Sequence, residues 1–188
     1  IAVLIFNTVF YSYFGMKRFI YPLAAGGIAF IAGIISERIF AKQREATKAA
    51  TEKEEKKRIK ARYLRISRLV LFLSVAALVF LILRVKYTGF FTENINVITK
   101  KLGSEHRIPI KEFVLPMGIS FYTLQAIGYI VDVYWEKMPA ERNFLKLLTF
   151  ITFFPTITEG PITPYIDVKE DLFRGKPLKY EDIYGGYI

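Results

Sequence analysis

Four stretches of this chain are almost free of charged side chains, and their lengths constrain the fold more than any other feature. Three uncharged runs cover residues 1–16, 19–35 and 69–83, and a fourth, 115–135, holds one acid, Asp132. An α-helix rises 1.5 Å per residue, so the fourth run extends about 31 Å, close to the roughly 30 Å hydrocarbon core of a bilayer. The other three are shorter and need flanking residues to span. One such run would also fit the core helix of a soluble protein, but four predict an integral membrane protein.

The composition excludes several other classes. Apolar residues make up 53% of the chain and the net charge is +10, a combination unlike that of an ordinary soluble domain or of a disordered segment. There is no cysteine and only one histidine, His106. A disulfide framework, a thiolate nucleophile and a Cys- or His-rich metal site are therefore excluded, and we expect no metal and no tightly bound cofactor. His106 lies in a polar stretch between two apolar runs, which favours an exposed loop histidine over a general base.

A basic block separates the second and third runs. Residues 37–68 supply +7 of the net charge and contain neither proline nor glycine, which predicts a helix. Because Lys and Arg accumulate in cytoplasmic loops, the basic segment 36–68 is predicted to be cytoplasmic. A nucleic-acid interface is the functional alternative for a basic helix, but apolar runs on both sides favour a solvated helix near anionic lipid. We expect no nucleic-acid partner.

The sequence therefore predicts an all-α fold, a polytopic integral bundle of helices that passes several times through the cell membrane. A broken or re-entrant segment is expected after the fourth membrane helix, because prolines and glycines interrupt the apolar stretch that follows. The chain does not begin with methionine, and we expect it to be part of a longer protein. The predicted segments are two short membrane helices in 1–35, the basic cytoplasmic helix 36–68, a third membrane helix 69–87, an outer loop 88–112, a fourth membrane helix 115–135 and a re-entrant or interfacial segment 143–164.

A polar stripe marks the fourth run. Tyr122, Gln125, Tyr129 and Asp132 follow at spacings of 3, 4 and 3, which places them within an arc of about 80° on a helix. Lipid cannot satisfy polar groups, so the stripe should face the bundle interior or a water-filled path. Hydrogen bonds to a neighbouring helix are the alternative, which is favoured for Gln125. For Asp132, an interfacial cap or an ion pair fits the pattern equally well. Glu159, in a segment broken by proline and glycine, could orient a substrate or cap a helix.

The sequence of residues 115–134, LPMGISFYTLQAIGYIVDVY, closely resembles a motif of bacterial membrane-bound O-acyltransferases (MBOAT). That group includes alginate O-acetyltransferase-like and D-alanyl transfer proteins. Arg142-Asn143 and the sequence FFPTITEGPI of residues 153–162 are similar to two further motifs of the family, in the same order. Many relatives carry an arginine shortly after the GPI sequence, whereas this chain has Thr163-Pro164, which puts an anion-binding role there in doubt.

The resemblance implies an integral enzyme that moves an acetyl or other small acyl group to hydroxyls of an exported polysaccharide or cell-wall polymer. The donor would be an acyl thioester, either acetyl-CoA or an acyl carrier protein. Membrane lipid and other polymer-modification proteins are the implied partners. The family's catalytic histidine follows the GPI motif, so His106 does not match it. We therefore assign no catalytic residue and expect this piece to be inactive alone.

Within that resemblance, four residues are predicted to line or shape a substrate tunnel: Tyr122, Gln125, Glu159 and Pro161. Two hypotheses from other classes stay open at this stage. The chain could be part of a multi-helix transporter or channel, with the polar stripe lining a permeation path. It could also be a non-catalytic membrane anchor that presents the basic helix.

Overall fold

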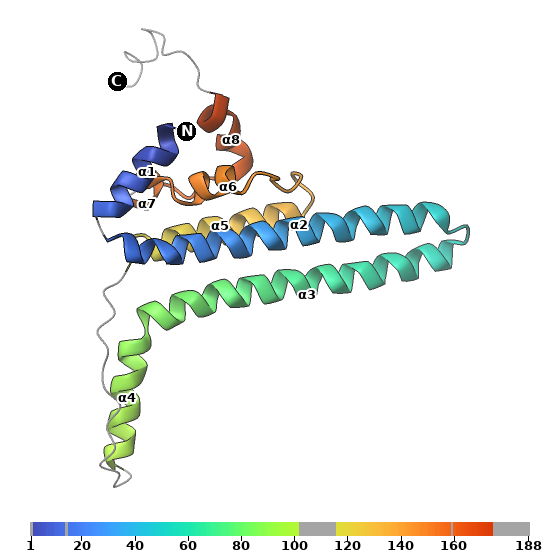
Figure 1. The fold of residues 1–188 in the computed structure, drawn as a ribbon. Coiled ribbons are helices and arrows are strands. Elements are labelled where there is room, and N and C mark those ends of the chain that lie inside the picture. The colour runs from blue at the N-terminus through green and yellow to red at the C-terminus, as the bar shows by residue number, and fades with distance from the viewer. Residues whose placement is uncertain (1, 14, 102–115, 159, 175–188) are drawn as a thin grey trace.

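The computed structural model describes residues 2–13, 15–101, 116–158 and 160–174, and every regular element in them is helical (Figure 1). This confirms the predicted all-α class for the described part of the chain. The elements are α1 (Ala2–Tyr13), the 3-10 helix η1 (Met16–Phe19), α2 (Ile20–Ala49), α3 (Lys53–Lys86), α4 (Thr88–Lys101), α5 (Ile119–Tyr134), α6 (Phe144–Ile151), α7 (Phe154–Thr158) and α8 (Tyr165–Arg174).

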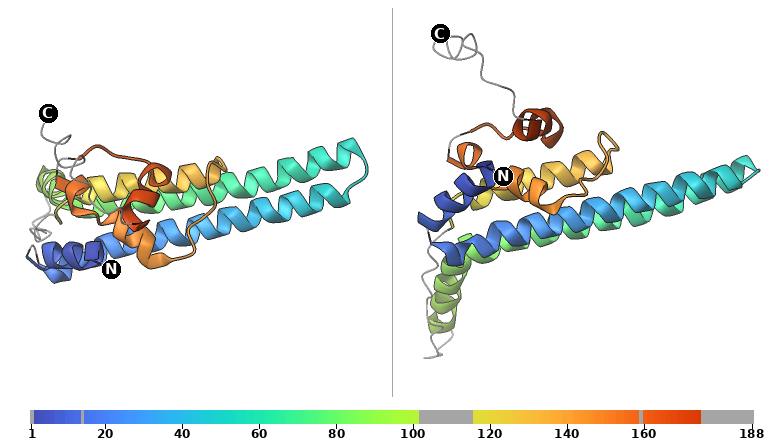
Figure 2. Two further views of the ribbon diagram at one scale, coloured as in Figure 1. Left: turned by 90° about the horizontal axis from the view of Figure 1, so that it is seen from above. Right: turned by 45° about the horizontal axis from the view of Figure 1, so that its top comes forward.

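Helices α2 and α3 form a long antiparallel hairpin, seen in both figures as the two longest ribbons side by side (Figures 1 and 2). The basic segment 36–68 is not a separate helix, because its two halves continue α2 and begin α3. No proline or glycine lies between Gly33 and Gly89, so nothing ends the helix where the charges start. The chain reverses only at Ala50–Glu52, where the backbone at both residues is extended.

In the part of the chain that the structure describes, two helices are long and apolar enough to cross a membrane: α2 together with the preceding turn, Met16–Ala49, and α3, Lys53–Lys86. Only 17% of the most apolar window of α3 is buried inside the protein. Its outward side chains include Phe72, Leu73 and Phe80, each more than half exposed. A long helix that is apolar on its exposed faces is suited to lipid rather than water.

Helix α5 lies at the centre of the helical packing. It begins after Gly118, whose φ of +75° is a left-handed conformation that favours glycine, and nine of its residues are buried. It runs alongside α2 and also contacts α3 and α6. At 16 residues, it is shorter than the predicted membrane helix 115–135 and extends about 24 Å. Helix α5 alone is therefore shorter than the hydrocarbon core of a typical bilayer.

A face of small residues on α2 lets α5 and α6 approach closely. Ala25, Gly26, Ala29, Ala32 and Gly33 are all buried. A Cβ atom on Gly33 would lie only 2.9 Å from the hydroxyl oxygen of Tyr129, and one on Gly26 would lie 3.2 Å from Cδ1 of Leu148. Small side chains at helix interfaces are the usual route to tight packing in membranes, where the lipid is as apolar as the protein.

The segment after α5 is broken, as the prolines and glycines predicted. Short helices α6, α7 and α8 follow one another with non-helical residues between them, and α1 packs against α6 (Figure 1). Whether 143–164 re-enters or lies on the membrane stays a prediction.

The predicted outer loop 88–112 begins with a helix, α4, which turns away from the direction of α3 (Figure 1). Its exposed side chains include Phe90, Phe91 and Ile98. Residues 102–115, and with them His106, lie outside the described residues.

Replacing Gly33 with alanine should destabilise the protein by about 1–3 kcal/mol, because the new methyl group would overlap the ring of Tyr129. Gly27→Ala is the matched control on the same helix, since nothing lies within 4 Å of the position that a Cβ would take there. That variant should be neutral or up to about 1 kcal/mol more stable, because alanine favours the helix. Thermal unfolding in detergent, followed by the fluorescence of Trp135, measures both. Equal stability of the two variants would contradict the close α2–α5 contact.

Candidate functional site

The polar stripe of α5 faces the interior, as the sequence predicted. Its four residues are at most 7% exposed. They do not form one site, however, because the two halves of the stripe have different surroundings. Tyr122 and Gln125 face α1 and α7, whereas Tyr129 and Asp132 face the loop that follows α5.

The first half leaves polar atoms without partners. Gln125 Nε2 donates a hydrogen bond to Thr156 Oγ1 in α7 at 3.0 Å, but the Gln125 Oε1 atom is buried with no partner among the described residues. The hydroxyl of Tyr122 is also buried, and no described residue forms a hydrogen bond with it. The hydroxyl of Tyr11, on α1, is a third such group, and it lies near enough to interact electrostatically with Tyr122. We call Tyr11, Tyr122 and Gln125 the open polar cluster.

An unpaired buried polar group costs about 1–3 kcal/mol, so native proteins seldom leave several of them together. One acceptor and two hydroxyls in the open polar cluster can therefore hydrogen-bond a polar molecule or another part of the protein. The sequence pattern identified Tyr122 and Gln125. It missed Tyr11, because an aromatic residue in an apolar run carries no distinguishing signal.

Asn7 satisfies the backbone where α6 gives way to α7. Its Nδ2 donates to Thr149 O and to Thr152 Oγ1, both at 3.1 Å, and its Oδ1 accepts from the N–H of Phe154 at 3.3 Å. Asn7 is 1% exposed. An interrupted helix in apolar surroundings needs partners of this kind for the backbone groups that the break leaves free. The periodicity of polar residues did not single out Asn7, although a lone asparagine in an uncharged run is a usable signal.

The second half of the stripe is engaged in the loop after α5. The backbone N–H of Glu141 donates to the Tyr129 hydroxyl at 2.9 Å. Asp132 forms an ion pair with Lys137 at 3.0 Å, which confirms the ion-pair alternative for this residue. Neither side chain has an open hydrogen-bonding role comparable with that of Tyr122.

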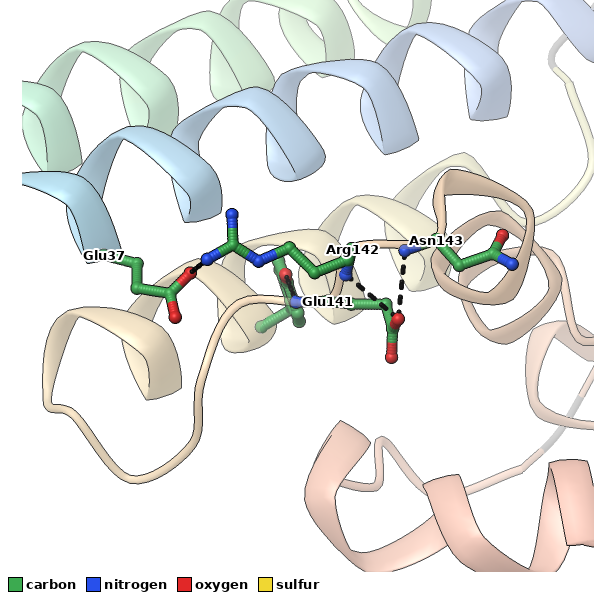
Figure 3. A network of polar contacts seen from close by, with 5 residues as sticks. Glu37, Glu141, Arg142 and Asn143 are labelled. Carbon is green, nitrogen blue, oxygen red and sulfur yellow. Dashed lines mark hydrogen bonds and ion pairs between the residues drawn. The ribbon is translucent and has the colours of Figure 1, made fainter.

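Glu141 joins the loop to two helices. One of its carboxylate oxygens accepts hydrogen bonds from the backbone N–H groups of Arg142 and Asn143 at 3.0 Å (Figure 3). The other accepts a hydrogen bond from the hydroxyl of Tyr165, in α8, at 2.7 Å. Asn143 then caps α6 by accepting from the N–H groups of Leu145 and Lys146. The arginine-asparagine motif is therefore a turn that starts α6.

Arg142 ties this turn to α2. Its guanidinium forms an ion pair with Glu37 at 2.7 Å, and Figure 3 shows it reaching from the loop to the end of the uncharged run of α2. Ion pairs with this degree of exposure contribute little to stability. The contact instead fixes the position of the loop relative to α2.

The two other predicted tunnel residues do not join the open polar cluster in the described structure. Pro161 is exposed, in the non-helical stretch before α8, while Tyr122 and Gln125 are buried. Glu159 lies outside the described residues. Gly160, between them, has a clear structural role, because a Cβ there would lie 2.6 Å from Cα of Thr156. The described residues contain no group of three or more His, Cys, Asp or Glu side chains suited to a metal ion.

Comparison with known proteins gives three kinds of relative. The chain is 36% identical to a probable alginate O-acetylase AlgI of Azotobacter vinelandii, over 44% of this chain and 16% of the relative. It is 31% identical to a peptidoglycan O-acetyltransferase of Helicobacter pylori, over 60% of this chain and 25% of the relative. It is also 31% identical to a teichoic acid D-alanyltransferase of Lacticaseibacillus rhamnosus, over 56% of this chain and 22% of the relative.

The chain thus spans at most a quarter of the length of these relatives. No protein-family model matches it, and no solved structure matches it either. The three relatives are all of the MBOAT type, which confirms the resemblance that the motifs indicated. Over 44–60% of its length, the chain is therefore a homologue of the membrane-bound O-acyltransferases.

Proposed function

We propose that the protein transfers an acetyl or other small acyl group to hydroxyls of an exported polysaccharide or cell-wall polymer. The observation that carries the proposal is its homology to three acyltransferases whose names give alginate, peptidoglycan and teichoic acid as acceptors. The donor would be an acyl thioester, on coenzyme A or on a carrier protein. The transporter alternative is not favoured, since these relatives are transferases.

The proposed setting is the cell membrane, crossed several times. Two helices of spanning length and the exposed apolar faces of α3 support this placement. The basic end of the α2–α3 hairpin would then lie in the cytoplasm, following the distribution of Lys and Arg in membrane proteins. The acceptor polymer and other polymer-modification proteins would meet the opposite side.

In this proposal, the open polar cluster contacts the hydroxyl-bearing acceptor. The Tyr122 hydroxyl and the Gln125 carbonyl oxygen form no hydrogen bond with any described residue. A sugar hydroxyl, which can both donate and accept, complements this pair. Glu159 and Pro161 are retained as shaping residues of the same tunnel.

Glu141 is a poor choice for the general base. Partial burial acts to raise the pKa of its carboxyl, but hydrogen bonds from Tyr165 and from the backbone N–H groups of Asn143 and Arg142 outweigh it, and the pKa lies below its ordinary value. A carboxylate whose proton affinity is lowered in this way does not readily take a proton from a hydroxyl at neutral pH. The base that the resemblance implies, a histidine after the GPI sequence, is not among the described residues.

Tyr122→Phe in the full-length protein tests the site most sharply. The variant loses only a hydroxyl that has no partner among the described residues, so its thermal stability should be unchanged or higher. Acyl transfer to the polymer should fall at least about tenfold if that hydroxyl binds the acceptor, which corresponds to the loss of about 1.4 kcal/mol. The measurement is incorporation of labelled acetyl into the polymer by membranes that contain the protein.

Gln125→Leu and Glu159→Gln should also reduce transfer, and Leu124→Ala serves as the control because Leu124 is 45% exposed on another face of α5. The control should retain the wild-type rate. Wild-type rates for Tyr122→Phe, Gln125→Leu and Glu159→Gln together would overturn the site assignment.

The stability of the fold should also depend on pH through Glu141. Because the Glu141 pKa is lower in the folded state than its ordinary value of 4.5, its carboxylate stabilises the fold above that pH. This stabilisation is lost as the pH falls through the lower, folded pKa. Glu141→Gln should therefore be less stable than wild type at pH 7 and unfold at a lower temperature. The loss in the free energy of unfolding should be on the order of 1 kcal/mol, once solvent screening is allowed for. The difference from wild type should shrink steadily below pH 4.5. A difference that stays constant down to pH 3 would contradict the role given to the charge.

A further inference from the structure

An apolar groove lies between the two arms of the hairpin at its open end. This is the end where α2 begins and where α3 gives way to α4 (Figure 1). The groove is a cavity of about 490 Å³, lined from Ile20 to Ile28 on α2 and from Ala77 to Val85 on α3. Eight of its nine lining side chains are aliphatic or aromatic, and the ninth is the cation Arg84. The groove therefore combines an apolar body with one positive charge.

The groove has the depth of one leaflet of a bilayer. Its lining covers residues 20 to 28 on one arm and 77 to 85 on the other, about 12 Å along each helix. Half of the roughly 30 Å hydrocarbon core is about 15 Å. Arg84 is the first residue after the uncharged run 69–83, so its guanidinium would lie at the edge of the hydrocarbon, while Ala77 lies inside it.

The charge of Arg84 is not neutralised by the described part of the protein. No ion pair of a described residue includes Arg84. Residues 1–36 and 56–92, which contain both walls of the groove, hold no aspartate or glutamate. Lys17, Arg18 and Lys86 add three further cations at the same end of the hairpin. An anion at this level would meet a positive potential.

These cations lie on the side of the membrane where Lys and Arg are least expected. In the proposed placement, the basic segment 36–68 is cytoplasmic, and the open end of the hairpin is therefore on the opposite side. Lys and Arg set topology by accumulating on the cytoplasmic side. That tendency does not account for cations beside the groove, whereas an anionic ligand does.

The lining favours a lipid over a further helix of the full-length protein. Helices that pack in membranes approach one another through small residues, as α2 approaches α5 at Gly33. The groove instead presents bulky side chains such as Tyr21 and Phe80, and Phe80 is 64% exposed. An apolar helix laid in the groove would also cover Arg84 without neutralising it, which costs free energy. A flexible acyl chain can follow bulky walls and brings its own phosphate to the level of Arg84.

We infer that the groove binds a phospholipid with an anionic headgroup. One acyl chain fills the space between the arms, and the headgroup phosphate accepts charge-assisted hydrogen bonds from the Arg84 guanidinium. The lipid contacts both α2 and α3, so it stabilises their packing at the end furthest from the turn at Ala50–Glu52. This inference does not depend on the proposed acyl-transfer function.

The test is lipid binding by the full-length protein, delipidated in detergent and followed by native mass spectrometry. The probes are phosphatidylglycerol, phosphatidylcholine with the same acyl chains, and glycerol 3-phosphate, which has the phosphate but no chains. Phosphatidylglycerol should bind saturably and more tightly than phosphatidylcholine, whose headgroup has no net charge. Glycerol 3-phosphate should not bind measurably. Arg84→Gln should weaken phosphatidylglycerol binding about tenfold and remove the preference for it.

Each test variant has a matched control on α3. Lys86→Gln removes a cation two residues from Arg84 that does not line the groove, and it should keep the wild-type preference. Ala77→Leu should fill the groove and weaken binding of both lipids. Ala76→Leu changes its exposed neighbour, which does not line the groove, and should bind both lipids like wild type.

Four outcomes would overturn the inference. Equal losses in Arg84→Gln and Lys86→Gln would mean that only net charge matters, and equal affinity for the two lipids would remove the anionic headgroup. Binding of glycerol 3-phosphate as tight as that of phosphatidylglycerol would make the site one for a free anion. Absence of saturable lipid binding would leave the groove to another occupant. A lower melting temperature for Ala77→Leu than for Ala76→Leu would then assign it to another segment of the full-length protein. Acyl transfer enters none of these readouts, so a failure of the proposed function is seen separately.

Discussion

The close approach of α5 to α2 at Gly33 is the contact on which the rest of the structure depends. Only a residue without a side chain leaves room there for the ring of Tyr129. The Tyr129 hydroxyl can then accept the N–H of Glu141, and the Glu141 carboxylate in turn holds the hydroxyl of Tyr165 on α8. A single missing methyl group on α2 therefore sets where the loop after α5, and through it α8, can pack.

The break between α6 and α7 explains how one side chain can be both structural and open. Apolar surroundings require partners for the polar groups around the interrupted helix, and Asn7 and Gln125 supply them from α1 and α5. Among the described residues, Gln125 forms one such side-chain hydrogen bond, from its amide NH₂ group to Thr156. Its carbonyl oxygen forms no hydrogen bond with a described residue and is therefore free to accept one from another molecule. Packing and substrate contact are thus compatible roles for Gln125.

Local patterns predicted much of this arrangement. Helical periodicity placed Tyr122, Gln125, Tyr129 and Asp132 on one buried face, and the prolines and glycines after the fourth run marked where the helix breaks. The sequence did not reveal the partners of Asn7, because they lie more than 140 residues further along the chain. The sequence pattern also placed the ends of α2 and α3 wrongly. Charged residues mark where a helix passes from apolar to aqueous surroundings, but they do not end it.

Helix α2 continues without a break from its uncharged run into the charged segment, so positions along it show how deep the open polar cluster lies. Contacts of Gly33 with Tyr129 and of Arg44 with Glu136 show that α5 runs parallel to α2, so Tyr122 lies near the level of Gly26. The uncharged run of α2 ends at Ile35, nine residues after Gly26, which is about 13 Å along the helix axis. Tyr122 and the rest of the open polar cluster therefore lie inside the apolar part of the bundle, where an unpaired polar group is costly.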